Sequence, residues 1–236
     1  MRNRGLLFSV IIGAINFAFV SGAGAAIVTF NDRATFLAHT SSSTTIDFGG
    51  IAPNGNFTLF ETPSGLTLSG VNFVGLPSNG FGLFVVDGNF CCATYTQRGG
   101  QVASLASPLS GPNGNSPIQV NLPNGTNAVG MDLFSVTNGD AAGVLTDTVQ
   151  IKVGADTFLV PTAPLSVGNG RVFFGFVSDT AVSSFSIDPT RTDIITSTNV
   201  VNFTFGVAAP VPLPAAFWLL GSALGGIGFA RRRVTS

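Results

Sequence analysis

Apolar and polar residues alternate in many short stretches of the chain between residues 26 and 210. In the stretch from Thr148 to Val153, for example, three apolar residues alternate with Gln150 and Lys152. A period of two places the apolar side chains on one face of a β-strand, and Gly, Pro, Asn and Asp residues mark the turns between strands. The pattern predicts strands at Ile27 to Phe30, Thr44 to Phe48, Phe57 to Phe60, Leu66 to Leu68, Val71 to Val74, Leu83 to Val86, Ile118 to Leu122, Ala128 to Phe134, Thr148 to Val153, Thr157 to Val160, Arg171 to Val177, Val182 to Ile187 and Val200 to Val207.

The last of these stretches, Val200 to Val207, has the clearest alternation. It predicts that Val201, Phe203, Phe205 and Val207 lie together on the buried face of the strand. A strand of this kind closes a domain by completing one of its sheets.

One helix is predicted among these strands, after residue 30. Asn31 or Asp32 provides an N-cap, and Phe36 with Leu37 provides an apolar face. A parallel sheet would need crossover helices between its strands, and the sequence offers almost none. The chain is therefore predicted to be all-β, a two-layer antiparallel β-sandwich of jelly-roll type with one short helix.

The first 25 residues have the pattern of a secretory signal peptide. Arg2 and Arg4 form a positive segment, Leu6 to Val20 form an apolar segment, and Ala23 and Ala25 are the small residues of a cleavage site. We expect residues 1–25 to be removed and the mature ectodomain to span 26–210. A retained N-terminal anchor is the weaker interpretation, because the apolar segment is short and Asn16 interrupts it.

The last 26 residues, 211–236, contain a second apolar segment. Residues 215–230 carry no charge, and as a helix they would be about 24 Å long, which makes a marginal transmembrane helix. Arg231, Arg232 and Arg233 follow directly. Because basic residues stay on the cytoplasmic side, these arginines act as a membrane stop and the ectodomain is expected outside the cell.

This tail begins with the motif Val211, Pro212, Leu213, Pro214 and Ala215. The motif, the apolar helix and the arginine cluster together resemble the PEP-CTERM family of bacterial sorting signals, in its variant with the sequence VPLPA. The commonest form of the motif has Glu at the position of Leu213. This difference leaves open which variant of the processing enzyme recognises the motif.

The resemblance implies export, temporary retention in the membrane, and recognition by an exosortase at the motif. It also implies delivery to the cell surface or extracellular matrix of a bacterium that makes exopolysaccharide. Two other interpretations of residues 211–236 are an ordinary C-terminal anchor and an apolar core helix at the end of the chain.

Charge and aromatic content limit the partners of the ectodomain. All 11 acidic residues of the chain lie between 26 and 210 with only five basic ones, which leaves a net charge of −6 and argues against nucleic acid as a partner. A surface rich in Ser, Thr, Asn and Gly suits contact with a neutral polysaccharide. However, the ectodomain has no Trp and only Tyr95, and its phenylalanines are predicted to be core rather than a sugar-stacking platform.

Candidate catalytic and metal-binding residues are few. The single histidine, His39, is predicted to end the helix, and no G-x-S-x-G motif accompanies any serine. Two adjacent cysteines and one histidine do not make a tetrahedral metal site. Asp179, Asp188 and Asp193 are candidate calcium ligands. Asp47, Glu61 and Asp132 could supply the carboxylate pair of a glycosidase. Positions in turns and helix caps explain both groups better.

The sequence therefore predicts an exported, non-enzymatic surface or matrix protein without a cofactor or metal. Its expected partners are an exosortase, the membrane through the C-terminal helix, and extracellular polysaccharide. A carbohydrate-binding module and a secreted glycan hydrolase are the two alternative interpretations.

Cys91 and Cys92 are adjacent, and export would place them in an oxidising compartment. A vicinal disulfide, an intermolecular link and two free thiols are all open, and the absence of another cysteine in the chain favours the vicinal bond. We expect the intact, non-reduced protein to be a monomer lighter than its reduced form by two hydrogen atoms. Mass spectrometry before and after reduction measures this, and a dimer mass that reductant converts to a monomer mass would contradict it.

Overall fold

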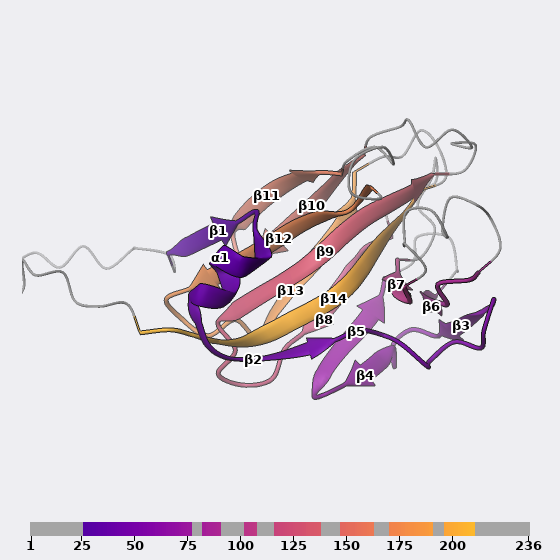
Figure 1. Cartoon of the computed structure of the whole chain (residues 1–236), viewed down its shortest axis with the longest axis horizontal. Coiled ribbons are helices and arrows are strands. Elements are labelled where there is room, and N and C mark those ends of the chain that lie inside the picture. Colours follow the sequence, from indigo (N-terminus) through magenta and orange to yellow (C-terminus); the bar gives the residue numbers. More distant parts are fainter. Residues whose placement is uncertain are drawn as a thin grey trace, which may run out of the picture.

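A computed structural model describes residues 26–76, 82–90, 102–107, 116–137, 147–162, 170–190 and 196–210. Within these ranges the chain forms one helix and a succession of short strands (Figure 1). In chain order they are β1 (Ile27–Phe30), α1 (Arg33–Ala38), β2 (Thr40–Ile46), β3 (Phe57–Phe60), β4 (Leu66–Leu68), β5 (Val71–Gly75), β6 (Leu83–Val86), β7 (Ser104–Ala106), β8 (Ile118–Asn121), β9 (Ala128–Thr137), β10 (Thr148–Val153), β11 (Asp156–Pro161), β12 (Val172–Ser178), β13 (Ser184–Pro189) and β14 (Thr196–Ala208).

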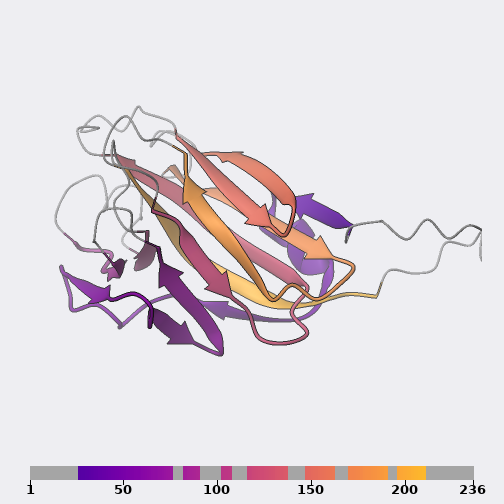
Figure 2. The ribbon, with the colours of Figure 1, turned by 180° about the vertical axis from the view of Figure 1, so that it is seen from behind.

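The strands form two antiparallel sheets that lie face to face, as the two opposite views in Figures 1 and 2 show. Sheet A is eight-stranded in the order β1-β12-β9-β14-β7-β6-β3, and β2 pairs with β14 outside this order. Sheet B is six-stranded in the order β11-β10-β13-β8-β5-β4. The prediction of an all-β protein with two antiparallel layers and one short helix is confirmed.

The core lies between the sheets and follows the alternation seen in the sequence. On β10, Val149, Ile151 and Val153 are buried, whereas Gln150 is half-buried and Lys152 is exposed, as predicted. Burial of apolar residues at every second position is what makes one face of each strand part of the core. The alternation alone therefore identified the inner face of this strand.

Phenylalanine rings connect the two sheets across the core. Phe203 of β14 packs against Phe73 of β5 at 5.1 Å between ring centroids and against Phe185 of β13 at 6.3 Å. Phe185 also meets Phe176 of β12 at 5.6 Å, nearly edge-on. Each such pair contributes about 0.5–1.5 kcal/mol beyond its buried area. These rings belong to the core as predicted, whereas Phe57 of β3 is 47% exposed and departs from the prediction.

The last strand differs from the prediction in which residues face the core. A bulge between Val201 and Thr204 changes the register, and Asn202 there has a positive φ of 48°. Because an extra residue reverses the face of everything beyond it, Val200 joins Phe203 in the inter-sheet core and Val201 does not. The predicted position of Val201 is therefore wrong. Val207, also predicted to be buried, is 44% exposed.

Helix α1 packs on the outer face of sheet A, and Phe36 is its one buried side chain. Asp32, not Asn31, caps it by accepting a hydrogen bond from the Thr35 backbone N–H at 2.8 Å. Phe36 is fully buried, whereas Leu37 is 40% exposed, so the predicted apolar face of two residues is in fact one residue.

The ring of Phe36 lies over two glycines of adjacent strands. A Cβ atom at Gly130 of β9 or Gly175 of β12 would lie 2.8 or 2.9 Å from a ring carbon of Phe36. These two glycines are paired across the strands. Because neither glycine has a side chain, the Phe36 ring can pack directly on the sheet backbone, and the helix approaches the sheet closely.

Substitution of Gly175 by alanine tests this fit. The new methyl group would meet the buried Phe36 ring, and such overpacking costs about 1–3 kcal/mol in free energy of unfolding. Gly49→Ala is a matched control, because a Cβ there meets nothing closer than 3.5 Å. Chemical denaturation measures both variants. Equal unfolding midpoints for G175A and G49A would show that the packing of Phe36 does not depend on a glycine at position 175.

Candidate functional site

The residues predicted to carry sorting and processing lie outside the described ranges. They are the motif Val211 to Ala215, the stop Arg231 to Arg233, the cleavage residues Ala23 and Ala25, and the pair Cys91 and Cys92. The described ranges contain no helix with the length and apolarity needed to cross a bilayer. The predicted span, residues 215–230, is not among them.

The described domain begins and ends at the same end of sheet A. Ile27 at the start of β1 pairs with Ser178, whose N–H donates to the carbonyl of Asn127 immediately before β9. Gly206, near the end of β14, pairs with Ala128 at the start of β9. The two chain ends therefore leave the sandwich together, at the left in Figure 1.

At the opposite end of the sandwich, the ends of β7, β9 and β14 meet around buried polar groups. Thr137 of β9 pairs with Thr196 of β14, and Ser107 after β7 exchanges hydrogen bonds with Thr198. The Ser197 hydroxyl donates to the Ser107 carbonyl at 3.0 Å. Because β14 spans Thr196–Ala208, this end is about 40 Å from the chain exits.

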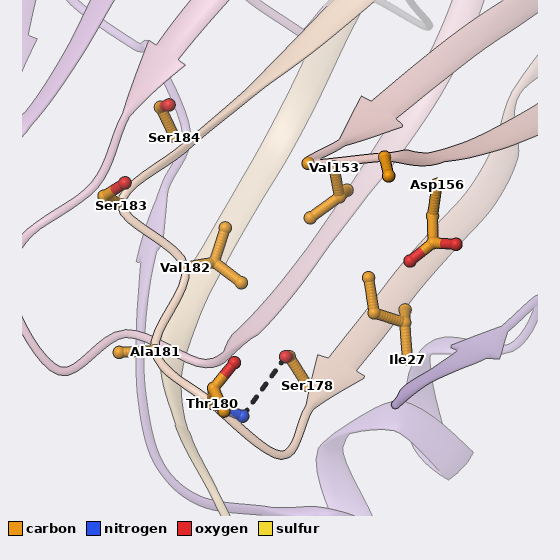
Figure 3. A pocket seen from close by; sticks show the side chains of 11 residues that line it. Ile27, Val153, Asp156, Ser178, Thr180, Ala181, Val182, Ser183 and Ser184 are labelled. Atoms are coloured by element: carbon orange, nitrogen blue, oxygen red, sulfur yellow. Dashed lines mark hydrogen bonds between the residues drawn. The ribbon is translucent and has the colours of Figure 1, made fainter. Parts of the chain in front are cut away.

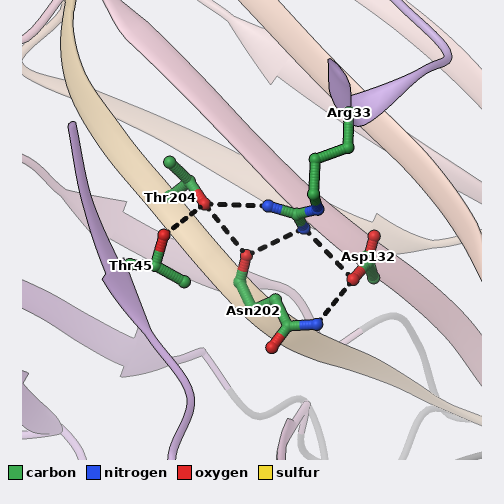
Figure 4. A network of polar contacts seen from close by, with 5 residues as sticks. All are labelled: Arg33, Thr45, Asp132, Asn202 and Thr204. Carbon is green, nitrogen blue, oxygen red and sulfur yellow. Dashed lines mark hydrogen bonds and ion pairs between the residues drawn. The ribbon is translucent and has the colours of Figure 1, made fainter. Parts of the chain in front are cut away.

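A polar network fixes the helix to sheet A (Figure 4). The Arg33 guanidinium donates to the Thr204 hydroxyl at 3.0 Å and to the Asn202 carbonyl at 3.1 Å, and it lies 3.1 Å from Asp132. The amide of Asn202 donates to the same Asp132 oxygen at 2.8 Å. The guanidinium also lies 4.8 Å from the ring centre of Phe173. Its contacts lie on β9, β12 and β14, so the network is a structural clamp.

His39 has the position predicted for it at the end of the helix. Its Nδ1 lies 2.8 Å from the Thr35 carbonyl oxygen, and its ring packs against Phe30 at 4.9 Å. Both contacts belong to the attachment of α1 to β1. They give the imidazole a role in the local packing of the helix terminus.

The acidic residues considered for calcium binding or glycoside hydrolysis do not form a common site, because those whose side chains make polar contacts each have a different partner. Asp188 pairs with Lys152 at 2.7 Å, Asp179 is exposed, and Asp193 lies outside the described ranges. Asp132 belongs to the Arg33 clamp, and Asp47 accepts a hydrogen bond from the Gly49 N–H at 3.0 Å in a turn.

Within the described ranges, no three acidic, cysteine or histidine side chains gather as metal ligands would. Glu61 follows β3 directly and its side chain is exposed.

A shallow pocket of about 260 Å³ opens at the chain-exit end, between the β10–β11 turn and the loop after β12 (Figure 3). Val153, Val182 and Ile27 form its apolar part, while Asp156 and Thr180 are at its rim. The Ser178 hydroxyl accepts a hydrogen bond from the Thr180 N–H at 3.3 Å. The pocket offers hydroxyl and carboxylate groups that can hydrogen-bond a small polar molecule.

The outer face of sheet B carries polar side chains in rows that cross its paired strands. Asn121 of β8 donates to the side chain of Asn72 on β5 at 3.1 Å, and Asn72 donates to the Thr67 hydroxyl of β4 at 3.0 Å. A second row, one step along the strands, runs from Gln119 through Ser186 to Lys152 and Thr157, and a third runs from Asp188 through Gln150 to Leu159.

We call this surface the amide face; its side chains are Thr67, Asn72, Gln119, Asn121, Gln150, Lys152, Thr157, Ser184, Ser186 and Asp188. Alternation along single strands does not distinguish this face from other exposed faces. The signal was present in the outward positions of the predicted strands, because asparagine is uncommon in strands and yet Asn72 and Asn121 lie opposite each other.

Local hydrogen bonds and burial change the pKa of three groups. The backbone N–H of Thr35, which the helix start presents, lowers the pKa of Asp32. The N–H groups of Gly55 and Asn89 lower the pKa of Asp87, which links the turn before β3 to the turn after β6. Burial lowers the pKa of Arg171, and the charge of Asp132 opposes this effect. The first two shifts belong to turn and cap positions.

Comparisons with known proteins identify no family. No family model matches the chain, and no curated protein matches it. Among solved structures, a match was found to TmCBM61 in complex with β-1,4-galactotriose, with 12% sequence identity and a TM-score of 0.21. The match covers 59% of this chain and 97% of the other.

Loss of the Arg33 side chain tests the clamp. In Arg33→Ala, the Thr204 hydroxyl and the Asn202 carbonyl lose a donor, and Asp132 loses its cation. We expect a loss of about 1–3 kcal/mol in free energy of unfolding, because three partly buried acceptors lose their charged donor and keep only neutral partners. Urea unfolding measures it, with Arg33→Lys expected to recover only part of the loss. A change in stability below about 0.5 kcal/mol in R33A would contradict the clamp.

Proposed function

We propose that this protein is an exported cell-surface or matrix protein that an exosortase sorts through residues 211–236. In this proposal its ectodomain, a sandwich of jelly-roll type, is carried outside the cell and associates with exopolysaccharide. The motif at Val211 to Ala215, the apolar segment after it and the arginines at 231–233 support the sorting step. The ectodomain does no chemistry of its own.

The observation that carries the proposal is the shared exit of the two chain ends. Ile27, two residues after the expected cleavage site, and Ala208, three residues before the sorting motif, lie at one end of sheet A. The Ala209 N–H donates to the His39 carbonyl at 2.8 Å, so the chain is held to the sandwich almost up to the motif.

A domain attached in this way stands with its exit end toward the membrane and the opposite end about 40 Å away. Pro210, Pro212 and Pro214 lie between the last strand and the apolar segment. Alternating prolines favour an extended, semi-rigid connection, which keeps the sandwich off the bilayer surface and leaves the motif reachable.

The ectodomain's charge and surface support association with a neutral rather than an anionic polymer. With 11 acidic residues and a net charge of −6, the domain repels polyanions. The amide face provides neutral donors and acceptors in rows. Such groups suit the hydroxyls of a neutral polysaccharide.

Measurement of the mature C-terminus tests the sorting step. The full chain is expressed in a host with and without an exosortase that recognises this motif variant, and the intact mass is determined. We expect loss of the tail near Val211 only when the enzyme is present, because the enzyme and not general proteolysis removes it.

A variant pair makes the result specific to the motif. Pro212→Ala with Pro214→Ala is expected to abolish processing, whereas Pro53→Ala, in an exposed turn, should be processed as the unmodified chain is. Tail loss at the same rate without the enzyme, or retention of the tail in its presence, would show that residues 211–236 are an ordinary anchor.

A further inference from the structure

We propose that the amide face of sheet B is the surface that binds a neutral polysaccharide chain. This inference rests on the proposed function and makes it more specific, since it names the face, the class of ligand and the groups that recognise it. Sheet B presents this face on the side of the sandwich away from helix α1, which packs on sheet A (Figures 1 and 2).

The two outer faces of the sandwich differ in what they leave open. On sheet A, Phe36 and Arg33 occupy the outer face, and Val201 and Phe134 there are fully buried. On sheet B, most outward side chains of neighbouring strands remain half-buried or exposed, whereas Val74 and Asp188 are buried. Sheet A also leaves residues exposed, on β2 and at Phe57 and Leu59 of β3. Among the described strands, sheet B presents open polar side chains on neighbouring, paired strands, as a long, flexible ligand would need.

The chemistry of the face suits hydroxyl groups. The amides of Gln119 and Gln150 each carry both a donor and an acceptor, as a sugar hydroxyl does. Asn72 already donates to the Ser64 carbonyl and the Thr67 hydroxyl and accepts from Asn121, so it orders the row of amides. Neighbouring strands lie about 4.8 Å apart, which is close to the rise of one sugar unit in an extended glycan, so successive rows can meet successive units. The face is thus a periodic set of matching groups rather than a single cavity.

Charge on this face is balanced. Lys152 and Asp188 are its only ionisable side chains on the strands that the structure describes, and their charged atoms lie 2.7 Å apart. The pair leaves the face electrically neutral. An anionic polymer would gain little from one already paired lysine and would be repelled by the acidic domain.

Asp188 provides an independent observation that points to a ligand. The residue is only 5% exposed, and its Oδ1 atom is buried without a hydrogen-bond partner, while Oδ2 accepts from Lys152. A buried carboxylate oxygen without a partner is unfavourable. A sugar hydroxyl donates to such an oxygen, and Lys152, whose side chain is 48% exposed, can move aside to admit it.

The binding mode follows from what the face contains. The described strands of this face carry no aromatic ring for stacking; Leu159, 64% exposed at the edge strand β11, adds apolar contact. Neutral hydrogen bonds on an open surface are individually weak, so we expect affinity to arise from many contacts along one polymer. Binding should therefore increase with polymer length.

Affinity electrophoresis of the full chain tests the proposal, with the protein purified in a detergent that has no sugar headgroup. Native gels contain hydroxyethylcellulose, dextran or galactomannan as neutral probes and alginate as the anionic one. We expect retardation by at least one neutral polymer and none by alginate. In Gln119→Ala with Gln150→Ala, the apparent affinity should fall roughly three- to tenfold, as expected for the loss of two neutral hydrogen-bonding side chains.

Two further variants complete the test. Asp188→Asn keeps the shape of the side chain and should weaken binding similarly, with its thermal unfolding measured to confirm that it is folded. Ser42→Ala with Thr44→Ala, on exposed β2 of sheet A, is the matched control and should bind as the unmodified chain does.

Each outcome decides a different point. Binding that is insensitive to the glutamine substitutions, or equally sensitive to the control ones, would overturn the assignment to the amide face while leaving polysaccharide association intact. Retardation by alginate as strong as by the neutral polymers would overturn the ligand class. If none of the neutral polymers retards the protein, both the face and the association fail, whereas sorting is decided separately by the C-terminal mass.

Discussion

The structure depends on the mutual burial of the inner faces of two sheets. The inner face of each sheet is a row of phenylalanine and branched aliphatic side chains. Exposure of such a face to water is unfavourable, so each sheet needs the other to cover it. Full burial of one such side chain contributes about 1.5–3 kcal/mol, so the packing of Phe203 against Phe73 and Phe185 outweighs any single polar contact described here. The inner positions are therefore constrained, and the outer positions are free to differ between the sheets.

The outer faces of the two sheets carry different side chains and contacts. Helix α1 has only six residues and would not form alone in water. It is held by Phe36, which needs the missing side chains of Gly130 and Gly175, and by Arg33, which needs acceptors on β9 and β14. Sheet A thus receives a cover that belongs to the N-terminal segment, whereas no described helix covers sheet B, which keeps rows of amides and hydroxyls.

The sequence predicted local features well and long-range ones poorly, for a physical reason. Alternation and turn residues depend on neighbours, so they identified the strands and the Asp32 cap region. The short β7, Ser104–Ala106, was missed, because all three of its residues are buried, Ser104 included, so polar and apolar residues do not separate an inner from an outer face. The bulge at Asn202 and the link from Arg33 to Thr204 were not foreseeable, since they join residues 171 positions apart or depend on tertiary strain. The amide face needed the registers of sheet B, which alternation does not provide.

The order of the strands also bears on how the chain folds if it is exported as proposed. The last strand, β14, lies inside sheet A, where it pairs with β9, β7 and β2, and β1 pairs with the late strand β12. Contacts of this separation form late, because the whole intervening chain must be closed into a loop first. In the proposed arrangement, sheet A therefore cannot be completed until Ala208 has crossed the membrane. Residues 215–230 then lie in the bilayer with the arginines on the cytoplasmic side, so a tail that pauses there holds the chain at the point where the last strand can join the sheet.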